Sequence, residues 1–137
     1  MIIGYTTGVF DMFHIGHLNI LRKAKEQCDF LIVGVSTVEL VMDYKRKKPV
    51  IPFDERIEIV KAIRYVDKTV PQTSLDKIAA WKKLQFNVLF HGTDWKGSAL
   101  YEKTEEDLEH VGVRVVWIPH TEGISSTMLT EKLQNRS

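Results

Sequence analysis

Short apolar segments alternate with segments of helical periodicity along the whole chain. The segment Phe30–Val35 reads FLIVGV, an uninterrupted apolar run that is typical of a strand buried on both faces. Strands that alternate with helices pair in parallel, because each crossover returns the chain to the same end of the sheet. We therefore predict an α/β fold, a single Rossmann-like domain over residues 1–137, with a five-stranded parallel sheet and helices on both faces.

The pattern also predicts where each element lies. The expected strands are Ile2–Thr7, Phe30–Val35, Tyr65–Val70, Asn87–His91 and Val113–Ile118. The expected helices are His14–Gln27, Thr37–Tyr44, Phe53–Ile63, Ser74–Leu84, Ala99–His110 and Ser125–Gln134. We expect Asp54 and Ser74 to cap the third and fourth helices, and Pro71 to end the third strand.

The length and charge of the chain limit its partners. Its 137 residues suit one domain with a substantial core. The formal net charge is +1, so we expect no binding of nucleic acid by the surface as a whole, and any anion site must be local. No apolar run reaches the roughly 20 residues of a membrane span, so we expect no membrane insertion. Cys28 is the one cysteine, which excludes an internal disulfide and fits a cytoplasmic protein.

Polar, glycine-rich or basic segments follow four of the predicted strands. GVFDMFHIGH follows the first strand, and Ser36 with a later basic run follows the second. GTDWKG follows the fourth strand, and PHTEGISST follows the fifth. In a parallel sheet these segments meet at one edge, where ligands bind near the point at which strand order reverses. The sequence therefore predicts a binding site at the carboxyl edge of the sheet.

Two histidines, His14 and His17, stand at the start of the first predicted helix with Gly16 between them. Residues three apart share a helix face, and the first turn adds unpaired N–H groups and a partial positive charge. Gly16 has no side chain and permits close approach of an anion. This group favours a phosphate that gains charge in a transition state. Two alternatives are that the histidines only pack at the helix start, or that they form a metal pair, for which further ligands at suitable spacing are lacking.

Two other segments are candidates for phosphate binding. Residues Lys45–Lys48 form a basic run near two prolines, which is either a solvated loop or a flap that folds over a polyphosphate. Gly123–Thr127 reads GISST and presents backbone N–H and hydroxyl groups at a helix start. It is either an anion cradle or a plain cap by Ser125. Arg56, in the first turn of the third predicted helix, also indicates an anionic partner.

Three motifs together resemble the cytidylyltransferase family of H-x-G-H nucleotidyltransferases. They are GVFDMFHIGH with its H-x-G-H core, RYVD at Arg64–Asp67, and TEGISST at Thr121–Thr127, and GTDW at Gly92–Trp95 agrees with them. The resemblance spans nearly the whole chain. It is closest to the glycerol-3-phosphate cytidylyltransferases of bacterial cell wall and capsule biosynthesis.

The resemblance implies that CTP and an alcohol phosphate react to give a CDP-alcohol and pyrophosphate. Mg²⁺ would accompany the nucleotide, and we predict no protein ligand for the metal. Glycerol 3-phosphate would be the acceptor and CDP-glycerol the product, with phosphocholine or phosphoethanolamine as alternative acceptors. The resemblance further implies a homodimer.

The resemblance also implies the residues of the site. The catalytic groups would be His14, His17, Lys45 and Thr127. The nucleotide would be bound by Gly8, Val9, Phe10, His14, Gly16, His17, Lys47, Gly92, Asp94, Trp95, His120, Thr121, Gly123, Ile124, Ser125, Ser126 and Thr127. The acceptor would be bound by Asp11, Lys45, Arg56, Arg64 and Lys77.

Two positions depart from the family pattern. His120 stands where the family usually has arginine, and Thr93 stands where a more acidic GDDW would have aspartate. Histidine is shorter than arginine and mostly neutral at pH 7, so the choice of nucleotide base stays open. Three other functions are therefore considered. They are adenylyl transfer to pantetheine phosphate or a flavin nucleotide, nucleotide sensing without catalysis, and simple metal binding.

Overall fold

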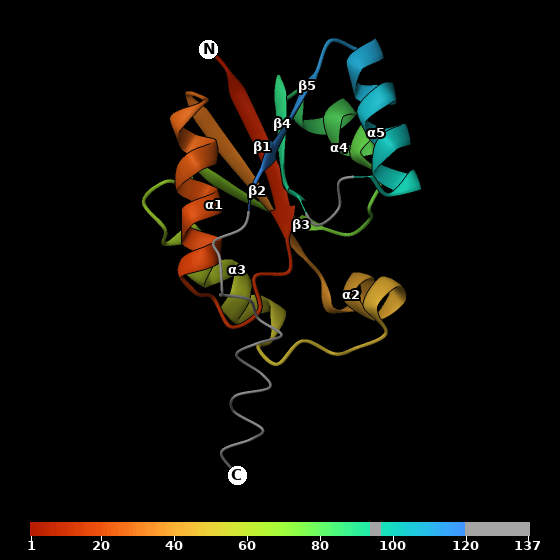
Figure 1. Cartoon of the computed structure of the whole chain (residues 1–137). Helices are drawn as coiled ribbons and strands as arrows, with labels where there is room; N and C mark the ends of the chain where they lie inside the picture. Colours follow the sequence, from red (N-terminus) through yellow and green to blue (C-terminus); the bar gives the residue numbers. More distant parts are fainter. Residues whose placement is uncertain (94–96, 120–137) are drawn as a thin grey trace.

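A computed structural model describes residues 1–93 and 97–119 of the chain (Figure 1). Five parallel strands form one sheet in the order β3-β2-β1-β4-β5, which confirms the predicted α/β fold. The strands are β1 (Ile3–Gly8), β2 (Phe30–Ser36), β3 (Lys68–Gln72), β4 (Val88–Gly92) and β5 (Arg114–Ile118). The helices are α1 (Ile15–Glu26), α2 (Val38–Lys45), α3 (Phe53–Lys61), α4 (Lys77–Leu84) and α5 (Ala99–His110).

The two faces of the sheet pack against different helices. Figure 1 shows α1 and α3 on one face, with α4 and α5 on the other. Leu31 and Val33 of β2 belong to the core under α1 and α3, whereas Ile32 belongs to the core under α4 and α5. Successive side chains of a strand point to opposite faces. A strand covered by helices on both faces therefore needs an unbroken apolar run such as that of β2.

Two helix caps differ from the prediction. Helix α3 begins at Phe53, so Asp54 lies within its first turn and does not cap it. Helix α4 begins at Lys77, and its cap is Asp76 rather than Ser74. The Asp76 carboxylate accepts two backbone N–H groups of the first turn, at 3.0 and 3.1 Å. Serine and aspartate are both good N-cap residues. Asp76 is the cap because it directly precedes the first helical residue, Lys77.

Strand β3 begins later than predicted and continues past Pro71 to Gln72. Proline has no N–H for a sheet ladder, which is why it was expected to end the strand. Since β3 is an edge strand, the backbone nitrogen of Pro71, which carries no hydrogen, can face away from β2 without breaking the sheet ladder. The extension matters because it brings Gln72 to the carboxyl edge of the sheet.

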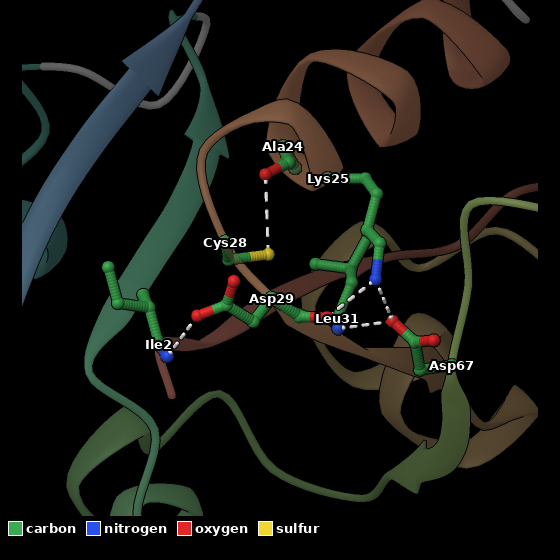
Figure 2. A network of polar contacts seen from close by, with 7 residues as sticks. All are labelled: Ile2, Ala24, Lys25, Cys28, Asp29, Leu31 and Asp67. Carbon is green, nitrogen blue, oxygen red and sulfur yellow. Dashed lines mark hydrogen bonds and ion pairs between the residues drawn. The ribbon is translucent and has the colours of Figure 1, made fainter.

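A polar network at the amino edge of the sheet joins α1 to the start of β2 (Figure 2). Lys25 Nζ lies 2.6 Å from Asp67 Oδ2, and the same oxygen accepts the backbone N–H of Leu31 at 2.8 Å. Lys25 also donates to the carbonyl of Asp29 at 2.7 Å, and the Asp29 carboxylate accepts the N–H of Ile2. The last residue of RYVD therefore has a structural role, because it holds the end of α1 to the first residues of β2.

We expect Asp67→Asn to make folding less sensitive to acid. Burial alone raises the pKa of Asp67, but the hydrogen bonds from Lys25 and the Leu31 N–H outweigh it and hold the pKa below its usual value. Such a carboxylate adds stability above its unfolded pKa of about 3.9, and this stability is lost as the pH falls through the folded pKa. Urea unfolding at several pH values should show a smaller loss between pH 5 and pH 2 for the variant than for wild type.

Because the Lys25–Asp67 pair is partly exposed, the variant should lose no more than about 1 kcal/mol of unfolding free energy at pH 7. Glu26→Gln removes an exposed carboxylate next to Lys25 at the end of α1 and is the matched control. Parallel pH curves for Asp67→Asn and wild type would contradict this assignment.

Candidate active site

A cavity of about 300 Å³ opens at the carboxyl edge of the sheet. The strand order reverses between β1 and β4, because the chain goes from β1 to β2 and β3 on one side and then returns to the other side. Ligands of such sheets bind in the crevice at this reversal, so the predicted position of the site is where the cavity lies. The lining residues are Thr6, Thr7, Gly8, Val9, Phe10, Asp11, Met12, His17, Ile20, Ser36, Val41, Tyr44, Lys45, Lys47, Lys48, Pro49, Val50, Gln72, Leu75, His91, Gly92 and Tyr101.

The loop between β1 and α1 contains two residues with left-handed backbone, Phe10 (φ 54°) and Met12 (φ 48°). This conformation costs an L-residue about 1–2 kcal/mol and is concentrated at ligand sites. The Phe10 side chain is buried in the core under α1 and α3. Gly8 allows this packing, since a Cβ at Gly8 would lie 3.0 Å from the Phe10 ring. The shape of the loop is thus set by core packing.

The two histidines form a reciprocal cap at the start of α1. His14 is the N-cap residue, and its Nδ1 accepts the N–H of Gly16 at 3.0 Å. His17 Nδ1 accepts the N–H of His14 at 3.2 Å. The two rings stack with centroids 4.0 Å apart, and His17 also packs against Phe10 and Phe13. These contacts hold both imidazoles in one orientation.

The caps determine which nitrogen of each ring is a donor. Both Nδ1 atoms accept a backbone N–H, so the proton of the neutral imidazole is on Nε2. The N–H of Gly16 is bonded to His14 and Gly16 is buried, so this N–H is already used by the cap. The predicted role of Gly16 in binding the nucleotide stays a prediction. The Nε2–H groups of both side chains are therefore donors at this helix start, and His17 lines the cavity.

The basic loop after α2 is held at both ends. Helix α2 supports its first end, and Asp11 binds its far end. The two carboxylate oxygens of Asp11 accept the backbone N–H groups of Val50 and Ile51, each at 2.8 Å. Between these anchors, Lys45 and two further lysines, Lys47 and Lys48, line the cavity. Asp11 was predicted to bind the acceptor, but the structure uses its carboxylate to position this loop.

Arg56 joins three segments of the cavity wall. Its Nε donates to the carbonyl of Ile51 at 2.9 Å, and its Nη1 donates to the carbonyls of Val9 and Ser36 at 2.9 and 2.7 Å. The side chain is only 1% exposed. Burial lowers the pKa of the guanidinium, and the charge of Asp11 opposes this effect. Arg56 is therefore a positioning residue for the loops after β1 and α2.

Three predicted acceptor ligands do not face the cavity. Arg56 is buried and bonded to backbone carbonyls. Lys77 is 2% exposed and lies behind Gln72. The Lys77 Nζ donates a hydrogen bond to Gln72 Oε1 at 2.6 Å. Arg64 precedes β3 and stacks over Tyr65, with its guanidinium 5.2 Å from the ring centre. The length of β3, roughly 16 Å at 3.3 Å per residue, separates this position from the carboxyl edge.

The sequence reasoning named Ser36 only as the residue after the second strand, and it missed Gln72, His91 and Tyr101 on the inner walls of the cavity. Gln72 Nε2 donates to Ser36 Oγ at 2.9 Å, and Lys77 stands behind this pair. On the other side, the Tyr101 hydroxyl lies 2.9 Å from His91 Nε2. Ser36 and Gln72 are the last residues of their strands. The search for polar residues after the strands found Ser36 but not Gln72, because the third strand was expected to end at Pro71, and it could not show the connection to Lys77.

We expect Lys77 to make the stability of the chain depend on pH in the alkaline range. Burial lowers its pKa from 10.5 to about 8. Since the folded pKa is below the unfolded one, folding penalises the charged amine below pH 8, and the penalty disappears as the pH rises towards 10.5. The unfolding free energy of wild type should therefore rise relative to that of Lys77→Met between pH 8 and pH 10. Lys82→Met, at an exposed position of the same helix, is the control, and a constant difference across this range would contradict the expectation.

The cavity brings together predicted residues from three segments, namely Gly8, Val9, Phe10, Asp11, His17, Lys45, Lys47 and Gly92. Other predicted residues lie outside the described part of the chain, namely Asp94, Trp95, His120, Thr121, Gly123, Ile124, Ser125, Ser126 and Thr127, as does the predicted helix Ser125–Gln134. The binding roles of all these residues stay predictions.

Outside this cavity, Cys28 is half-buried and its thiol donates to the Ala24 carbonyl at 3.4 Å. Burial raises the pKa of the thiol, which disfavours a nucleophilic role. Within residues 1–93 and 97–119, no three His, Cys, Asp or Glu side chains are grouped so as to hold a metal ion. None of the helices in these two ranges has the length and apolar character needed to cross a membrane.

Comparison with known proteins gives consistent results. The model of the cytidylyltransferase-like family matches residues 5–132. The chain is 33% identical over 135 residues to the glycerol-3-phosphate cytidylyltransferase of Bacillus subtilis strain 168, covering 93% of this chain and 94% of the other. It is 37% identical over 117 residues to the FAD synthase of Thermococcus kodakarensis, covering 82% and 76%. Its fold is similar to that of a lipopolysaccharide core biosynthesis protein from Thermoplasma volcanium, with a TM-score of 0.73, 22% identity and coverage of 88% and 97%.

Proposed function

The chain belongs to the cytidylyltransferase-like family, and from this premise we propose that it transfers a cytidylyl group from CTP to a small alcohol phosphate, namely glycerol 3-phosphate. A phosphate oxygen of the acceptor attacks the α-phosphorus of CTP. The bond between the α-phosphorus and the oxygen that bridges it to the β-phosphorus breaks, and pyrophosphate leaves with that oxygen. The products are CDP-glycerol and pyrophosphate.

The observation that carries this proposal is the set of donors in one cavity. His17 presents an Nε2–H whose direction is set by the bond to the His14 backbone, and Lys45 and Lys47 line the same cavity. In-line transfer between two anions requires that both be held and that their repulsion be neutralised. Fixed N–H groups and lysines at a strand-order reversal meet this requirement.

The described site has no obvious general base, and the proposed reaction does not need one. The second pKa of a phosphate monoester is about 6, so the acceptor is largely dianionic at neutral pH. Its oxygen is already a nucleophile. The protein therefore contributes positioning and electrostatic stabilisation of the charge that develops on the transferred phosphoryl group.

We also propose that Mg²⁺ enters with the triphosphate. Asp11 is the one carboxylate among the cavity-lining residues, and its two oxygens accept the N–H groups of Val50 and Ile51. The described residues thus fit poorly as a dedicated magnesium site, and the phosphates of the nucleotide would be the ligands of the metal.

The remaining parts of the proposal rest on the resemblance. They are a homodimer, a cytoplasmic location, and a role in cell wall or capsule biosynthesis. A single cysteine, Cys28, is also consistent with the cytoplasm. Sedimentation of the purified chain tests the oligomeric state directly.

A second candidate is adenylyl transfer from ATP to a small phosphate acceptor. The similarity to an FAD synthase favours it, and so does His120 at a position where an arginine is expected. The first candidate is preferred, because the similarity to the glycerol-3-phosphate cytidylyltransferase covers more of both chains.

A pyrophosphate-release assay separates the candidates. The chain is incubated with CTP or ATP, each with glycerol 3-phosphate, phosphocholine, phosphoethanolamine, pantetheine phosphate or flavin mononucleotide. The expected result is Mg²⁺-dependent release with CTP and glycerol 3-phosphate, and formation of CDP-glycerol confirmed by mass spectrometry. The proposed function would be refuted if pyrophosphate were released with ATP but not with CTP, or if no combination of nucleotide and acceptor gave release.

A further inference from the structure

The cavity extends across the ends of three neighbouring strands. His17, which packs against Phe10 in the loop after β1, lines one part of it, and Gln72 lines it at the end of β3. Neighbouring strands lie about 4.8 Å apart, so the ends of β1 and β3 are separated by two strand spacings, about 10 Å. A molecule in this cavity can therefore have one end at the histidine and the other at Gln72.

Lys77 determines the orientation of the Gln72 amide. Burial lowers the pKa of Lys77 to about 8, against the opposing charge of Asp76, so the amine is still mostly charged at neutral pH and has donors only. It donates to Gln72 Oε1 at 2.6 Å. The amide nitrogen carries two N–H groups, and one of them donates to Ser36 Oγ at 2.9 Å. The oxygen of the amide and one of its hydrogens are thus both used inside the wall.

The second N–H of the Gln72 amide has no acceptor within residues 1–93 and 97–119. The side chain is 5% exposed, and it is part of the lining of the cavity. A ligand that displaces water from this end of the cavity must therefore supply an acceptor atom, because otherwise the N–H loses its hydrogen-bond partner.

The buried charge of Lys77 makes this N–H a stronger donor. No carboxylate in the part of the chain that the structure describes forms an ion pair with the Lys77 amine, and that of Asp76 caps α4. The amine contacts the Gln72 oxygen and lies 5.9 Å from the centre of the Tyr101 ring. A charged donor polarises the amide to which it is bonded, and successive hydrogen bonds strengthen one another. The effect of the lysine charge therefore reaches the cavity through the Gln72 amide.

We propose that the side-chain N–H of Gln72 binds the hydroxyl oxygen at the end of the acceptor farthest from its phosphate, and that Lys77 positions the amide for this contact. The inference rests on the proposed function, because the reacting acceptor phosphate then lies at the α-phosphorus of CTP, on the side of His17 and Lys45. In glycerol 3-phosphate the farthest group is the hydroxyl on C1. Gln72 is thus a specificity-determining residue, and Lys77 is a positioning residue.

Three acceptors that differ by single hydroxyl groups test this contact, with CTP as the nucleotide and kcat/KM from pyrophosphate release as the measurement. Glycerol 3-phosphate carries two hydroxyls, 3-hydroxypropyl phosphate keeps only the one farthest from the phosphate, and propyl phosphate has neither. Wild type should use the first two within about threefold of each other. It should use propyl phosphate about tenfold less well than 3-hydroxypropyl phosphate, since a buried donor left unpaired disfavours the analogue that lacks its partner.

Gln72→Met removes both N–H groups and keeps much of the side-chain volume. The ratio of kcat/KM for 3-hydroxypropyl phosphate to that for propyl phosphate should fall from about ten to about one, while the value for propyl phosphate changes little. Lys77→Met should lower the same ratio part of the way, because the amide is no longer held in one orientation. A purely structural effect of Lys77→Met would lower both values together and leave the ratio unchanged. Gln27→Met, at the exposed end of α1, is the control and should leave all three values unchanged.

Two results would overturn the inference while leaving cytidylyl transfer intact. One is a wild type that uses 3-hydroxypropyl phosphate and propyl phosphate equally well, and the other is a Gln72→Met variant that keeps the wild-type ratio. If Gln72→Met does not fold, the double variant with Lys77→Met takes its place, since replacing both hydrogen-bond partners by apolar groups costs little stability. Absence of turnover with CTP and all three acceptors would refute the proposed function, and the inference with it.

Discussion

His17→Gln is expected to lower kcat by about 10²–10³-fold and to leave the melting temperature close to that of wild type. Glutamine at this helix position can accept the backbone N–H of the cap residue through its side-chain oxygen, so it can replace the bond that His17 Nδ1 makes to His14. It cannot place an N–H group where the rigid ring presents Nε2–H. A fixed donor aimed at developing negative charge is worth about 3–4 kcal/mol of transition-state stabilisation. The measurement is steady-state pyrophosphate release with CTP and glycerol 3-phosphate.

His17→Ala separates catalysis from folding. Alanine removes the donor, the cap and the contacts with Phe10 and Phe13 together, so kcat should fall as far as in His17→Gln and stability should fall as well, by about 1 kcal/mol or more. His110→Gln, at the exposed end of α5, is the control for changing a histidine elsewhere. Near-normal kcat in His17→Gln would show that the ring acts only as a cap.

Arg56→Met should cost about 3–5 kcal/mol of unfolding free energy and also lower kcat/KM. The guanidinium makes three bonds to backbone carbonyls of three different segments, those of Val9, Ser36 and Ile51. Methionine fills much of the same volume but leaves these carbonyls without their donor, and hydrogen bonds to a charged group are the stronger ones. Urea unfolding measures the stability, and the KM for CTP reports whether the basic loop is displaced.

A second arginine, Arg64, provides the matched control. It is exposed and stacked on Tyr65 just before β3, so Arg64→Met should change the unfolding free energy by no more than about 0.5 kcal/mol. Arg56→Lys should recover only part of the loss, because a single ammonium on a flexible stem cannot reproduce the fork that spans three carbonyls. Equal stability of Arg56→Met and Arg64→Met would contradict the positioning role.

The fold could be predicted because its information is local. An unbroken apolar run such as Phe30–Val35 specifies burial on both faces, and alternation with helical stripes specifies parallel pairing. The edge of the sheet that carries the binding site could be predicted in the same way. The segments that follow parallel strands all lie at the carboxyl edge of the sheet. Element ends were less certain where two candidate caps compete, as at Ser74 and Asp76, or where a proline lies on an edge strand.

The roles of single side chains could not be predicted in the same way. His14 and His17 were identified as a pair at a helix start, but only the structure shows that their Nδ1 atoms are used by the backbone and that Nε2–H is the donor. Arg56 and Lys77 were expected to contact the acceptor, and both are buried behind the cavity wall.

The amino-acid sequence by itself therefore determined the order of elements, the parallel sheet and the edge at which a ligand would bind. These depend on periodicity and on neighbours close in the chain. Only the tertiary structure decided which charges face the cavity, because a cation on an amphipathic helix is compatible with solvent, with a ligand or with backbone carbonyls. The choice among these is made by segments far away in sequence, as when Arg56 meets the ends of β1 and β2.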